Sequence, residues 1–342
     1  MGMNRFYFFV FGLFCLMAPA LQAADARADF LKLIAHGRVA LSPEVNAVPT
    51  TNGLVEYHFS FAPDGEQRVP GLLVKSTNWA GARPVVIVLH GTGGTKEGVM
   101  PWLRELAERG FVAVAIDGRF HGERTKAGKG TAEYDAAIVR AWQGERGHPF
   151  FYDTVWDVMR LVDYLQTRED VDAARIGLTG ISKGGVETYL AAALDPRITV
   201  AAPCIGVQSF KWALDNNDWQ GRIGTIQGAF DTIAKSAGVS QPDSAFVQTF
   251  YDRVTPGIYS EFDGPAMLKL IAPRPLLMVN SDSDNHTPLP GVMECVTAAK
   301  SAYGADGAAE RFEVLIQAQT GHKVTAASEQ AVMEWFGRWL KP

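Results

Sequence analysis

From about residue 54 onwards, short runs of β-forming residues alternate with longer amphipathic stretches. This alternation is typical of β-α-β units, in which parallel strands are joined by crossover helices. The run from Val85 to His90 is continuous and rich in β-branched residues, and a glycine cluster ends it. Such a run indicates a strand that is buried on both faces. The sequence therefore predicts an α/β fold with a mostly parallel sheet.

The same periodicity places the other regular elements. We expect strands at 111–116, 175–179, 199–202, 275–280 and 311–317, and helices at 102–109, 153–165, 182–193 and 326–340. Helix 182–193 is expected to stop before Pro196, because a residue that precedes proline disfavours the helical conformation.

The segment 203–271 departs from this alternation and is dense in aromatic side chains. We predict a mostly helical, cap-like insertion that lies over the edge of the sheet. Its aromatic residues allow two interpretations: they wall a substrate pocket, as aromatic linings often do, or they fill the core of the insertion itself. They are Phe210, Trp212, Trp219, Phe230, Phe246, Phe250, Tyr251, Tyr259 and Phe262.

The N-terminus has the layout of a secretory signal peptide. A positive charge at Arg5 precedes an apolar run over 6–18, and small residues surround Ala23. The run is shorter than the ~20 residues that a membrane-spanning helix needs. We expect cleavage after residues 1–23, which leaves a secreted or periplasmic protein without a stable membrane anchor; an uncleaved anchor is the alternative. Residues 24–53 form a lead-in without assignment, and 54–342 form the main domain.

Charge and cysteine content argue against two classes of protein. Lysine and arginine number 32 against 37 aspartates and glutamates, a formal net charge of -5, whereas nucleic-acid binders usually carry a basic stripe. The cysteines at 15, 204 and 295 fit no zinc-ligand spacing. We therefore expect no nucleic-acid partner and no structural metal. Cys204 and Cys295 remain able to pair in an oxidising compartment.

Residues 180–184, Gly-Ile-Ser-Lys-Gly, match the pattern G-x-S-x-G between a predicted strand and a predicted helix. On such a tight turn the serine hydroxyl projects clear of the sheet, and the glycines relieve the crowded backbone. The context predicts that Ser182 is a nucleophile.

A serine hydroxyl needs a base within hydrogen-bond reach, and a carboxylate orients that base. His322 follows the last predicted strand, and Asp282 and Asp284 follow the strand before it. The chain order Ser, Asp, His is the one expected when strands of one sheet each deliver a partner. We predict His322 as the base and favour Asp284 over Asp282 as the acid.

The third element is the loop His90-Gly91-Thr92-Gly93-Gly94 after the first strong strand. Its glycines let backbone N–H groups face an incoming carbonyl. We predict an oxyanion hole made by the backbone N–H groups of Thr92 and Lys183. A phosphate-binding loop would need G-x-x-x-x-G-K-[ST], and this stretch does not have that spacing.

Several other polar residues are expected to have structural roles. Asp117, Arg119 and Arg124 follow a strand and suit ion pairs and turns. His90 suits a turn, and the side chain of Lys183 is expected to lean away from the site. His286 is expected to be a loop residue, with substrate contact as the alternative.

With these motifs the sequence resembles the α/β-hydrolase superfamily from about residue 55 to the C-terminus. Residues 119–124, 180–185 and 272–277 resemble the dienelactone hydrolase and acetyl xylan esterase branch. The resemblance implies an eight-stranded, mostly parallel sheet with helices on both faces, an insertion after strand 6, and ester hydrolysis without a cofactor. Dienelactone hydrolases use a cysteine nucleophile, so Ser182 favours the esterases.

These features predict an exported serine carboxylic-ester hydrolase that forms an acyl-enzyme. The resemblance favours short acyl esters such as acetylated carbohydrate as substrates. Two alternatives remain: a serine peptidase of the prolyl oligopeptidase type with the same triad, and a non-catalytic binding protein on a hydrolase scaffold.

Overall fold

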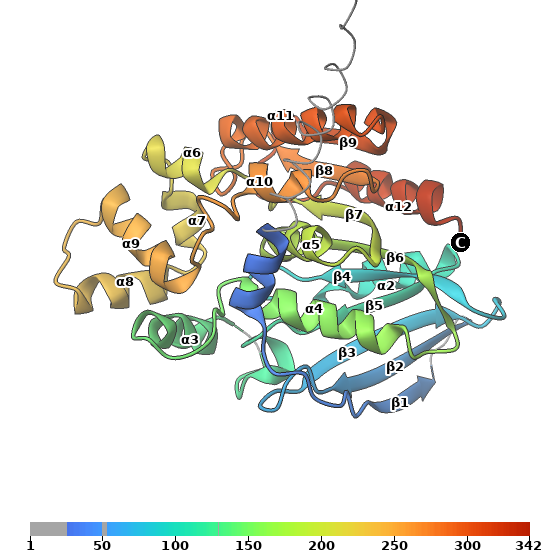
Figure 1. Ribbon diagram of the computed structural model, residues 1–342. Helices are drawn as coiled ribbons and strands as arrows, with labels where there is room; N and C mark the ends of the chain where they lie inside the picture. Colours follow the sequence, from blue (N-terminus) through green and yellow to red (C-terminus); the bar gives the residue numbers. More distant parts are fainter. Residues whose placement is uncertain (1–25, 50–52, 129) are drawn as a thin grey trace, which may run out of the picture.

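A computed structural model of the chain describes residues 26–49, 53–128 and 130–342. In these residues nine strands form one sheet, with helices on both faces (Figure 1). The strands are β1 (Glu44–Pro49), β2 (Leu54–Phe61), β3 (Val69–Ser76), β4 (Arg83–Leu89), β5 (Val112–Ile116), β6 (Val171–Ile181), β7 (Ile198–Cys204), β8 (Leu276–Ser281) and β9 (Phe312–Gln317).

A helix over residues 26–34 precedes the sheet. The later helices are α2 (Met100–Glu108), α3 (Ala132–Trp142), α4 (Tyr152–Leu165), α5 (Lys183–Leu194), α6 (Phe210–Asp215), α7 (Gln220–Gly224), α8 (Gln227–Ser236), α9 (Ser244–Val254), α10 (Gly264–Lys269), α11 (Leu289–Ala305) and α12 (Ala326–Leu340). Short 3-10 turns lie at Lys96–Val99, Gly122–Arg124 and Ala309–Arg311.

The strand order is β1-β2-β3-β5-β4-β6-β7-β8-β9. Strands β5, β4, β6, β7, β8 and β9 are parallel, whereas β1, β2 and β3 join antiparallel at one side. This mixed, mostly parallel sheet confirms the predicted α/β class. It has nine strands rather than the expected eight, because β1 adds an edge strand. The insertion therefore follows the seventh strand, not the sixth.

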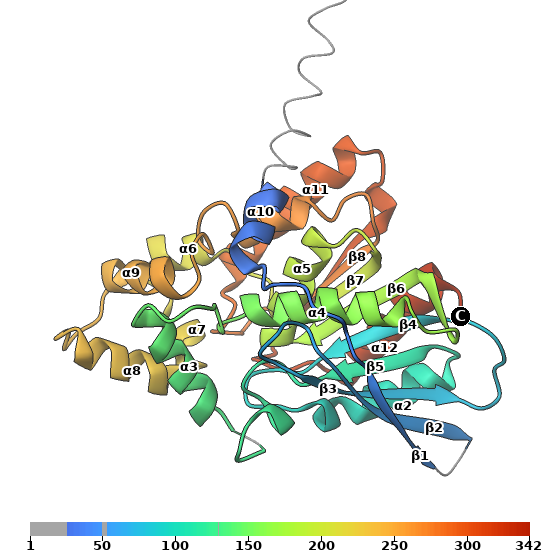
Figure 2. The same ribbon diagram turned by 60° about the horizontal axis from the view of Figure 1, so that its bottom comes forward.

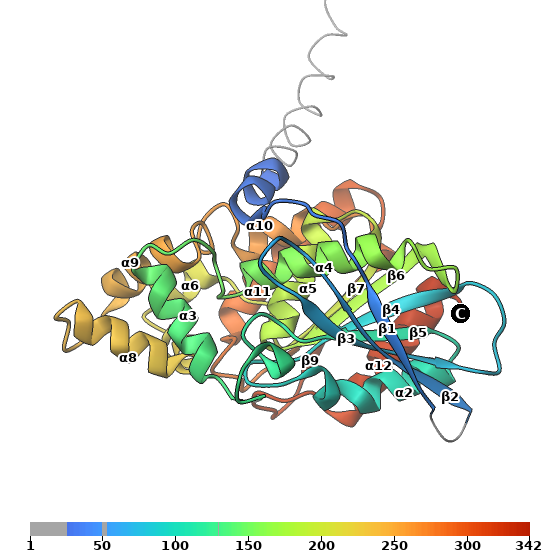
Figure 3. The same cartoon turned by 90° about the horizontal axis from the view of Figure 1, so that it is seen from below.

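Alternating side chains of the central strands enter two separate cores. Val85 and Ile87 of β4 join the cluster under α4, α5 and α11, while Val86 and Val88 join the cluster under α2 and α12. The period of two along a strand explains this division. Helices therefore cover both faces of the central sheet (Figures 1 and 3).

The lead-in, which the sequence left unassigned, contributes to the main core. Phe30 of helix 26–34 is fully buried and packs on Phe262 and Tyr152, with 4.6 Å between ring centroids in each pair. Residues 1–25 lie outside the described part of the chain, and so does the predicted signal peptide. Among the described residues, no helix has the length and apolar character needed to cross a bilayer.

The segment 203–271 carries helices α6 to α10. Helices α6 to α9 gather with α3 at one end of the molecule in all three views (Figures 1, 2 and 3), and α3 packs against α8 and α9. Six of the nine aromatic residues are buried in the core that also contains Val85 and Ile87 of β4: Phe210, Trp219, Phe230, Phe250, Tyr251 and Phe262. These six therefore fill a core rather than wall a pocket.

The two cysteines that the structure describes have no disulfide. Cys204 on β7 and Cys295 on α11 are both free and fully buried. Burial raises the pKa of the Cys204 thiol to about 12, so this side chain packs as a small apolar group.

Candidate active site

Ser182 lies on the sharp turn between β6 and α5 and has a positive φ of 58°. This conformation is costly for a residue with a side chain, and such strain concentrates at functional sites. The turn is possible only with close backbone packing: a Cβ at Gly184 would lie 2.5 Å from the carbonyl oxygen of Leu89. The two glycines of the motif thus let the turn pack against the end of β4.

The structure brings Ser182, His322 and Asp284 together from three different loops. The Nε2 atom of His322 lies 2.7 Å from the Ser182 hydroxyl oxygen, and its Nδ1 atom lies 2.7 Å from Oδ2 of Asp284. Serine and aspartate thus contact opposite edges of one imidazole. This is the geometry that a general base needs in order to take a proton from a hydroxyl.

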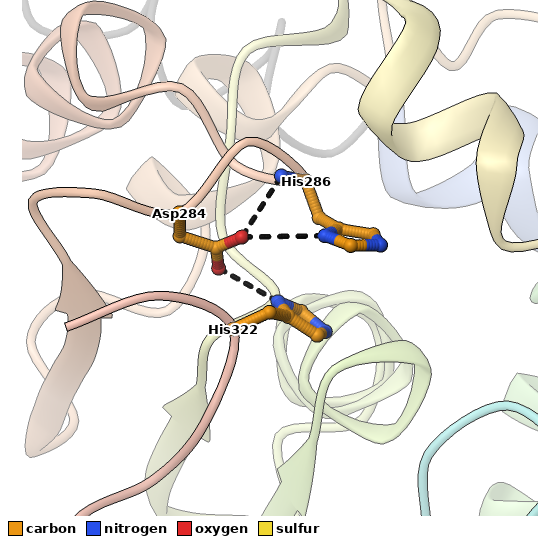
Figure 4. Close-up of side chains that lie close together, drawn as sticks. All are labelled: Asp284, His286 and His322. Atoms are coloured by element: carbon orange, nitrogen blue, oxygen red, sulfur yellow. Dashed lines mark hydrogen bonds and ion pairs between the residues drawn. The ribbon is translucent and has the colours of Figure 1, made fainter.

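Asp284 is 3% exposed and accepts two further hydrogen bonds from its own loop. The His286 backbone N–H donates to Oδ1 at 2.8 Å, and the Thr287 hydroxyl donates to Oδ2 at 2.9 Å. Burial by itself would raise the pKa of Asp284, but the interactions with His286 and His322 outweigh it and hold the pKa well below its usual range. The carboxylate is therefore ionised when it faces His322 (Figure 4).

Asp282, the alternative acid, points elsewhere. Its carboxylate accepts the backbone N–H groups of Gln319 at 2.9 Å and Thr320 at 3.3 Å, and the hydroxyl of Ser283 at 2.8 Å. These bonds tie the loop after β8 to the loop that carries His322. Of the two candidate carboxylates, Asp284 is the one that contacts the imidazole.

His286 stacks on His322, with ring centroids 4.2 Å apart and planes inclined by 26° (Figure 4). Its Nδ1 atom lies 3.5 Å from Oδ1 of Asp284. The three groups lie close enough to suggest a metal site, but a metal ion must lie near the plane of each imidazole that binds it. Two stacked, nearly parallel rings cannot meet that condition together. The arrangement instead suits a carboxylate that orients one base.

The loop after β4 lies directly against the nucleophile. A Cβ at Gly91 would lie 3.5 Å from the Cβ of Ser182. The Thr92 N–H makes no hydrogen bond within the described residues. Lys183 is the first residue of α5, so its N–H has no acceptor in a preceding turn. Both predicted oxyanion donors therefore have an N–H without an acceptor among the described residues.

The neighbouring His90 is bonded through both ring nitrogens to backbone. Its Nε2 accepts from the Gly118 N–H at 3.0 Å, which leaves Nδ1 to donate to the Gly91 carbonyl at 2.8 Å. Burial, and then the charge of Lys183, lower the pKa of His90 to about 3. Its role is to hold the loop, as the sequence suggested.

The side chain of Lys183 turns into the protein and forms a fully buried ion pair with Glu187 one turn later on α5. The Lys183 side chain is therefore held by Glu187 and is not bonded to the Ser182 hydroxyl. Glu187 is likewise occupied by this pair.

Asp117, Arg119 and Arg124 form the ion pairs expected of them. Asp117 accepts from Lys96 Nζ at 3.0 Å, and both arginines donate to Asp157 of α4, Arg119 at 2.9 Å and Arg124 at 2.6 Å. These carboxylates are completely buried, and their partners carry a permanent charge.

Sequence reasoning did not identify the supports of the Asp284 loop. Thr287 was missed, although a hydroxyl three residues after an aspartate is a common local hydrogen-bonding pattern. Gln208 was missed as well. When the Gln208 side-chain amide is oriented with its nitrogen toward His286, it donates to the His286 carbonyl at 2.8 Å and its oxygen accepts from Arg222 Nε at 3.1 Å. No local sequence pattern connects Gln208 and Arg222 with the loop after β8.

Comparison with protein families finds two matches. The acetyl xylan esterase (AXE1) family matches residues 32–214, more than half of the chain, and the fungal glucuronyl esterase family matches residues 150–307.

Individual proteins agree with these matches. The Bacillus subtilis protein YtaP, named as a hydrolase, is 27% identical over 291 residues, which cover 81% of this chain and 85% of YtaP. The acetyl xylan esterase from Paenibacillus sp. R4 is 22% identical, with 94% of each chain covered and a TM-score of 0.68. This likeness confirms the α/β-hydrolase fold. The 4-O-methyl-glucuronoyl methylesterase 1 of Sodiomyces alcalophilus is 27% identical over 162 residues, 46% of this chain and 31% of that protein.

Proposed function

The chain belongs to the acetyl xylan esterase (AXE1) family, and from this premise we propose that it is an exported serine esterase that removes short acyl groups, such as acetyl, from carbohydrate. Its family places it among the carboxylic ester hydrolases. Membership of an esterase family leaves no support for the non-catalytic alternative and favours ester over peptide substrates. The single observation that supports the mechanism is the imidazole of His322, which contacts Ser182 on one side and Asp284 on the other.

In the proposed mechanism the Ser182 hydroxyl oxygen attacks the ester carbonyl while Nε2 of His322 takes its proton. Asp284 holds the ring by its Nδ1–H and stabilises the imidazolium. The backbone N–H groups of Thr92 and Lys183 donate to the oxyanion; losing one such donor typically costs about 10²–10³ in rate.

His322 then protonates the leaving alcohol, and an acyl group remains on Ser182. Water enters, gives a proton to His322 and attacks the acyl carbon. His322 returns this proton to the Ser182 oxygen as its bond to the acyl carbon breaks, so the acid leaves and the serine hydroxyl is regenerated.

Export rests on the N-terminal pattern at 1–23, a charged start, an apolar run and small residues. Expression of the full chain with cell fractionation, followed by N-terminal sequencing of the released protein, tests it. Release into the periplasm or medium with a new N-terminus near residue 24 is expected. A full-length protein that stays in the cytoplasm would contradict export.

A second candidate substrate is an ester of glucuronic acid. The match to the fungal glucuronyl esterase family over 150–307 supports it, because this range includes Ser182 and Asp284. In that case the acyl part of the ester, rather than the alcohol part, would be the sugar.

The deciding experiment offers purified mature protein acetylated xylan, p-nitrophenyl acetate and the methyl ester of glucuronic acid. Release of acetate, with an acetyl group trapped on Ser182 and detected by mass spectrometry, is expected. Methanol release without acetate release would favour the second candidate. If no ester is cleaved, or if the adduct forms on another residue, the proposed function is wrong.

A further inference from the structure

A cavity of about 520 Å³ lies outside the candidate active site. This volume is within the range of roughly 300–1,000 Å³ that ligand pockets occupy. Its lining comes from the lead-in, the β2–β3 turn, the loop after β5, α3 and the start of α4. We propose that this cavity is a second binding site, which holds a neutral stretch of the sugar chain that carries the ester. The identity of the ligand as the substrate chain rests on the proposed function.

The floor of the cavity is a closed network of opposite charges. His36 lies between two carboxylates, with Nε2 at 3.1 Å from Asp153 and Nδ1 at 3.8 Å from Asp64. Arg119 donates to Asp64 at 2.6 Å and also to Asp157. The whole lining carries four arginines against four carboxylates, so it favours neither an anion nor a cation strongly; they are Arg38, Arg119, Arg140, Arg146, Asp64, Glu66, Glu145 and Asp153.

At the rim of the cavity two arginines form ion pairs. Arg140 pairs with Glu145 at 3.1 Å, and Arg38 approaches Asp163 at 3.6 Å. The lining therefore offers guanidinium donors and carboxylate acceptors side by side, but little net charge. Groups of this kind suit the hydroxyls of a neutral sugar, since each hydroxyl both donates and accepts.

Phe120 adds an aromatic wall in an unusual backbone conformation. It lines the cavity, it is partly exposed, and its φ is 59°. For a bulky residue a positive φ is a true outlier, and such strain persists where the surroundings require it. Within the lining, the guanidinium carbon of Arg140 lies 5.8 Å from the centroid of the Phe120 ring. An aromatic face beside polar groups is a common feature of ligand sites.

The cavity lies on the same edge of the sheet as Ser182. Strand β3 is antiparallel to β5, with Gly71 opposite Ile116, so the turn before β3 and the loop after β5 share one edge. This is also the carboxyl edge of β6, where the nucleophile lies. In the order β3-β5-β4-β6, β5 is two strands from β6, which corresponds to about 10 Å. A chain of several sugar rings is long enough to reach both sites.

The test measures binding rather than hydrolysis. The inactive Ser182→Ala protein is titrated by calorimetry with unacetylated xylotetraose, cellotetraose and mannotetraose. We expect at least one of them to bind, and we expect Phe120→Gly and Arg146→Ala, each added to Ser182→Ala, to raise its Kd about fivefold to tenfold, as the loss of one good contact does.

The two cavity variants are chosen to keep the fold intact, so that a change in Kd reports on contacts in the cavity. Glycine at 120 accepts a positive φ without strain. Arg146 is an exposed rim residue, and its truncation is expected to leave the fold intact, which thermal unfolding checks. Trp79→Ala is the matched control: this aromatic residue is 47% exposed at the opposite edge of the sheet, and its loss should leave Kd unchanged.

The proposal is overturned if none of the three oligosaccharides binds, or if Kd is the same in both cavity variants as in their Ser182→Ala parent. Its failure is distinct from that of the proposed function. Binding that depends on the cavity in a protein whose unmodified form cleaves no ester would refute the function alone. Hydrolysis of acetylated xylan without such binding would refute the second site alone.

Discussion

The loop after β5 (117–124) and the loop after β8 (282–288) leave the same edge of the sheet, and the surroundings of each bury carboxylates. Around the first loop, Asp117 is bonded to Lys96, and Asp157 is bonded to two arginines. In the second loop, Asp284 is bonded to an imidazole, a hydroxyl and a backbone N–H. The two loops thus use the same chemical group with different partners.

The difference lies in what the partner can do. Lysine and arginine keep their charge at any working pH, so a carboxylate bonded to them is held in place and does no proton chemistry. An imidazole gains and loses a proton near neutral pH. A carboxylate that faces an imidazole can therefore stabilise the charge that forms when the imidazole takes a proton from Ser182. Burial alone therefore does not distinguish the proposed catalytic acid from a structural carboxylate.

The largest expected effect concerns Ser182 and His322. Ser182→Ala and His322→Ala should each lower kcat for p-nitrophenyl acetate by about 10⁴–10⁶-fold, because attack and proton transfer act as a unit. Stopped-flow or long-time spectrophotometric assays measure this loss, and circular dichroism checks the fold. Ser283→Ala, an exposed serine in the second loop, is the control and should remain active. Near-normal turnover of His322→Ala would remove the base from the mechanism.

Asp284→Asn should have the next largest effect, and it tests whether the carboxylate of the second loop acts on the imidazole. An amide in place of the carboxylate neither stabilises the imidazolium nor holds the correct tautomer, and a loss of about 10⁴-fold in kcat is expected. Asp282→Asn is the matched control two residues away, and its loss of kcat should be much smaller, because Asp282 is bonded to two backbone N–H groups and the Ser283 hydroxyl and not to the imidazole. Equal losses of kcat in the two variants would show that activity depends on the conformation of the loop rather than on the Asp284 carboxylate.

Around the first loop, removal of a carboxylate should affect stability instead. Asp157→Asn removes the carboxylate that the buried Arg119 and Arg124 share and leaves Arg119 with Asp64 alone. We expect the free energy of unfolding to fall by about 3–5 kcal/mol. Urea unfolding followed by fluorescence measures it. Asp215→Asn removes a carboxylate from an exposed ion pair with Lys211 and should change little. A variant at 157 that lost activity but kept its stability would contradict the structural role.

The smallest effect is a pH dependence of stability from the histidines near the first loop. Burial, and then the charge of Lys183, lower the pKa of His90 to about 3 and of His121 to about 2. The unfolded chain binds protons at these residues below pH 6.5, whereas the folded protein does not. Stability is therefore full above pH 6.5 and falls as the pH drops, by about 2 kcal/mol per group at pH 5.

Urea unfolding at several values between pH 5 and 7 measures this slope. His121→Phe should lower the slope of the unfolding free energy against pH by the contribution of one histidine. Removal of His58, which is exposed on β2, should leave this slope unchanged. A slope that is unchanged in His121→Phe would show that His121 does not carry the effect.

The elements that the sequence predicted correctly are those whose signals are local. The buried run at 85–90, the helix over 326–340 and the strand-to-helix turn at 180–184 each lie within a few residues of their predicted bounds. Hydrophobic periodicity and glycines at a crowded turn act over short distances along the chain. Strand β1 was missed because it pairs with one neighbour only and exposes Val45 and Val48, so no apolar face marks it.

By itself, then, the amino-acid sequence determined the α/β class, the position of the strained serine and the set of candidate partners. Only the tertiary structure decided that Asp157 of α4 neutralises two arginines of a distant loop, and that six of the nine aromatic residues of 203–271 fill a core. It also showed that Asp284, which the sequence favoured over Asp282, meets His322. The physical reason is that hydrogen bonds and ion pairs depend on distances of a few ångströms between segments. Those distances exist only after strands far apart in the chain have paired.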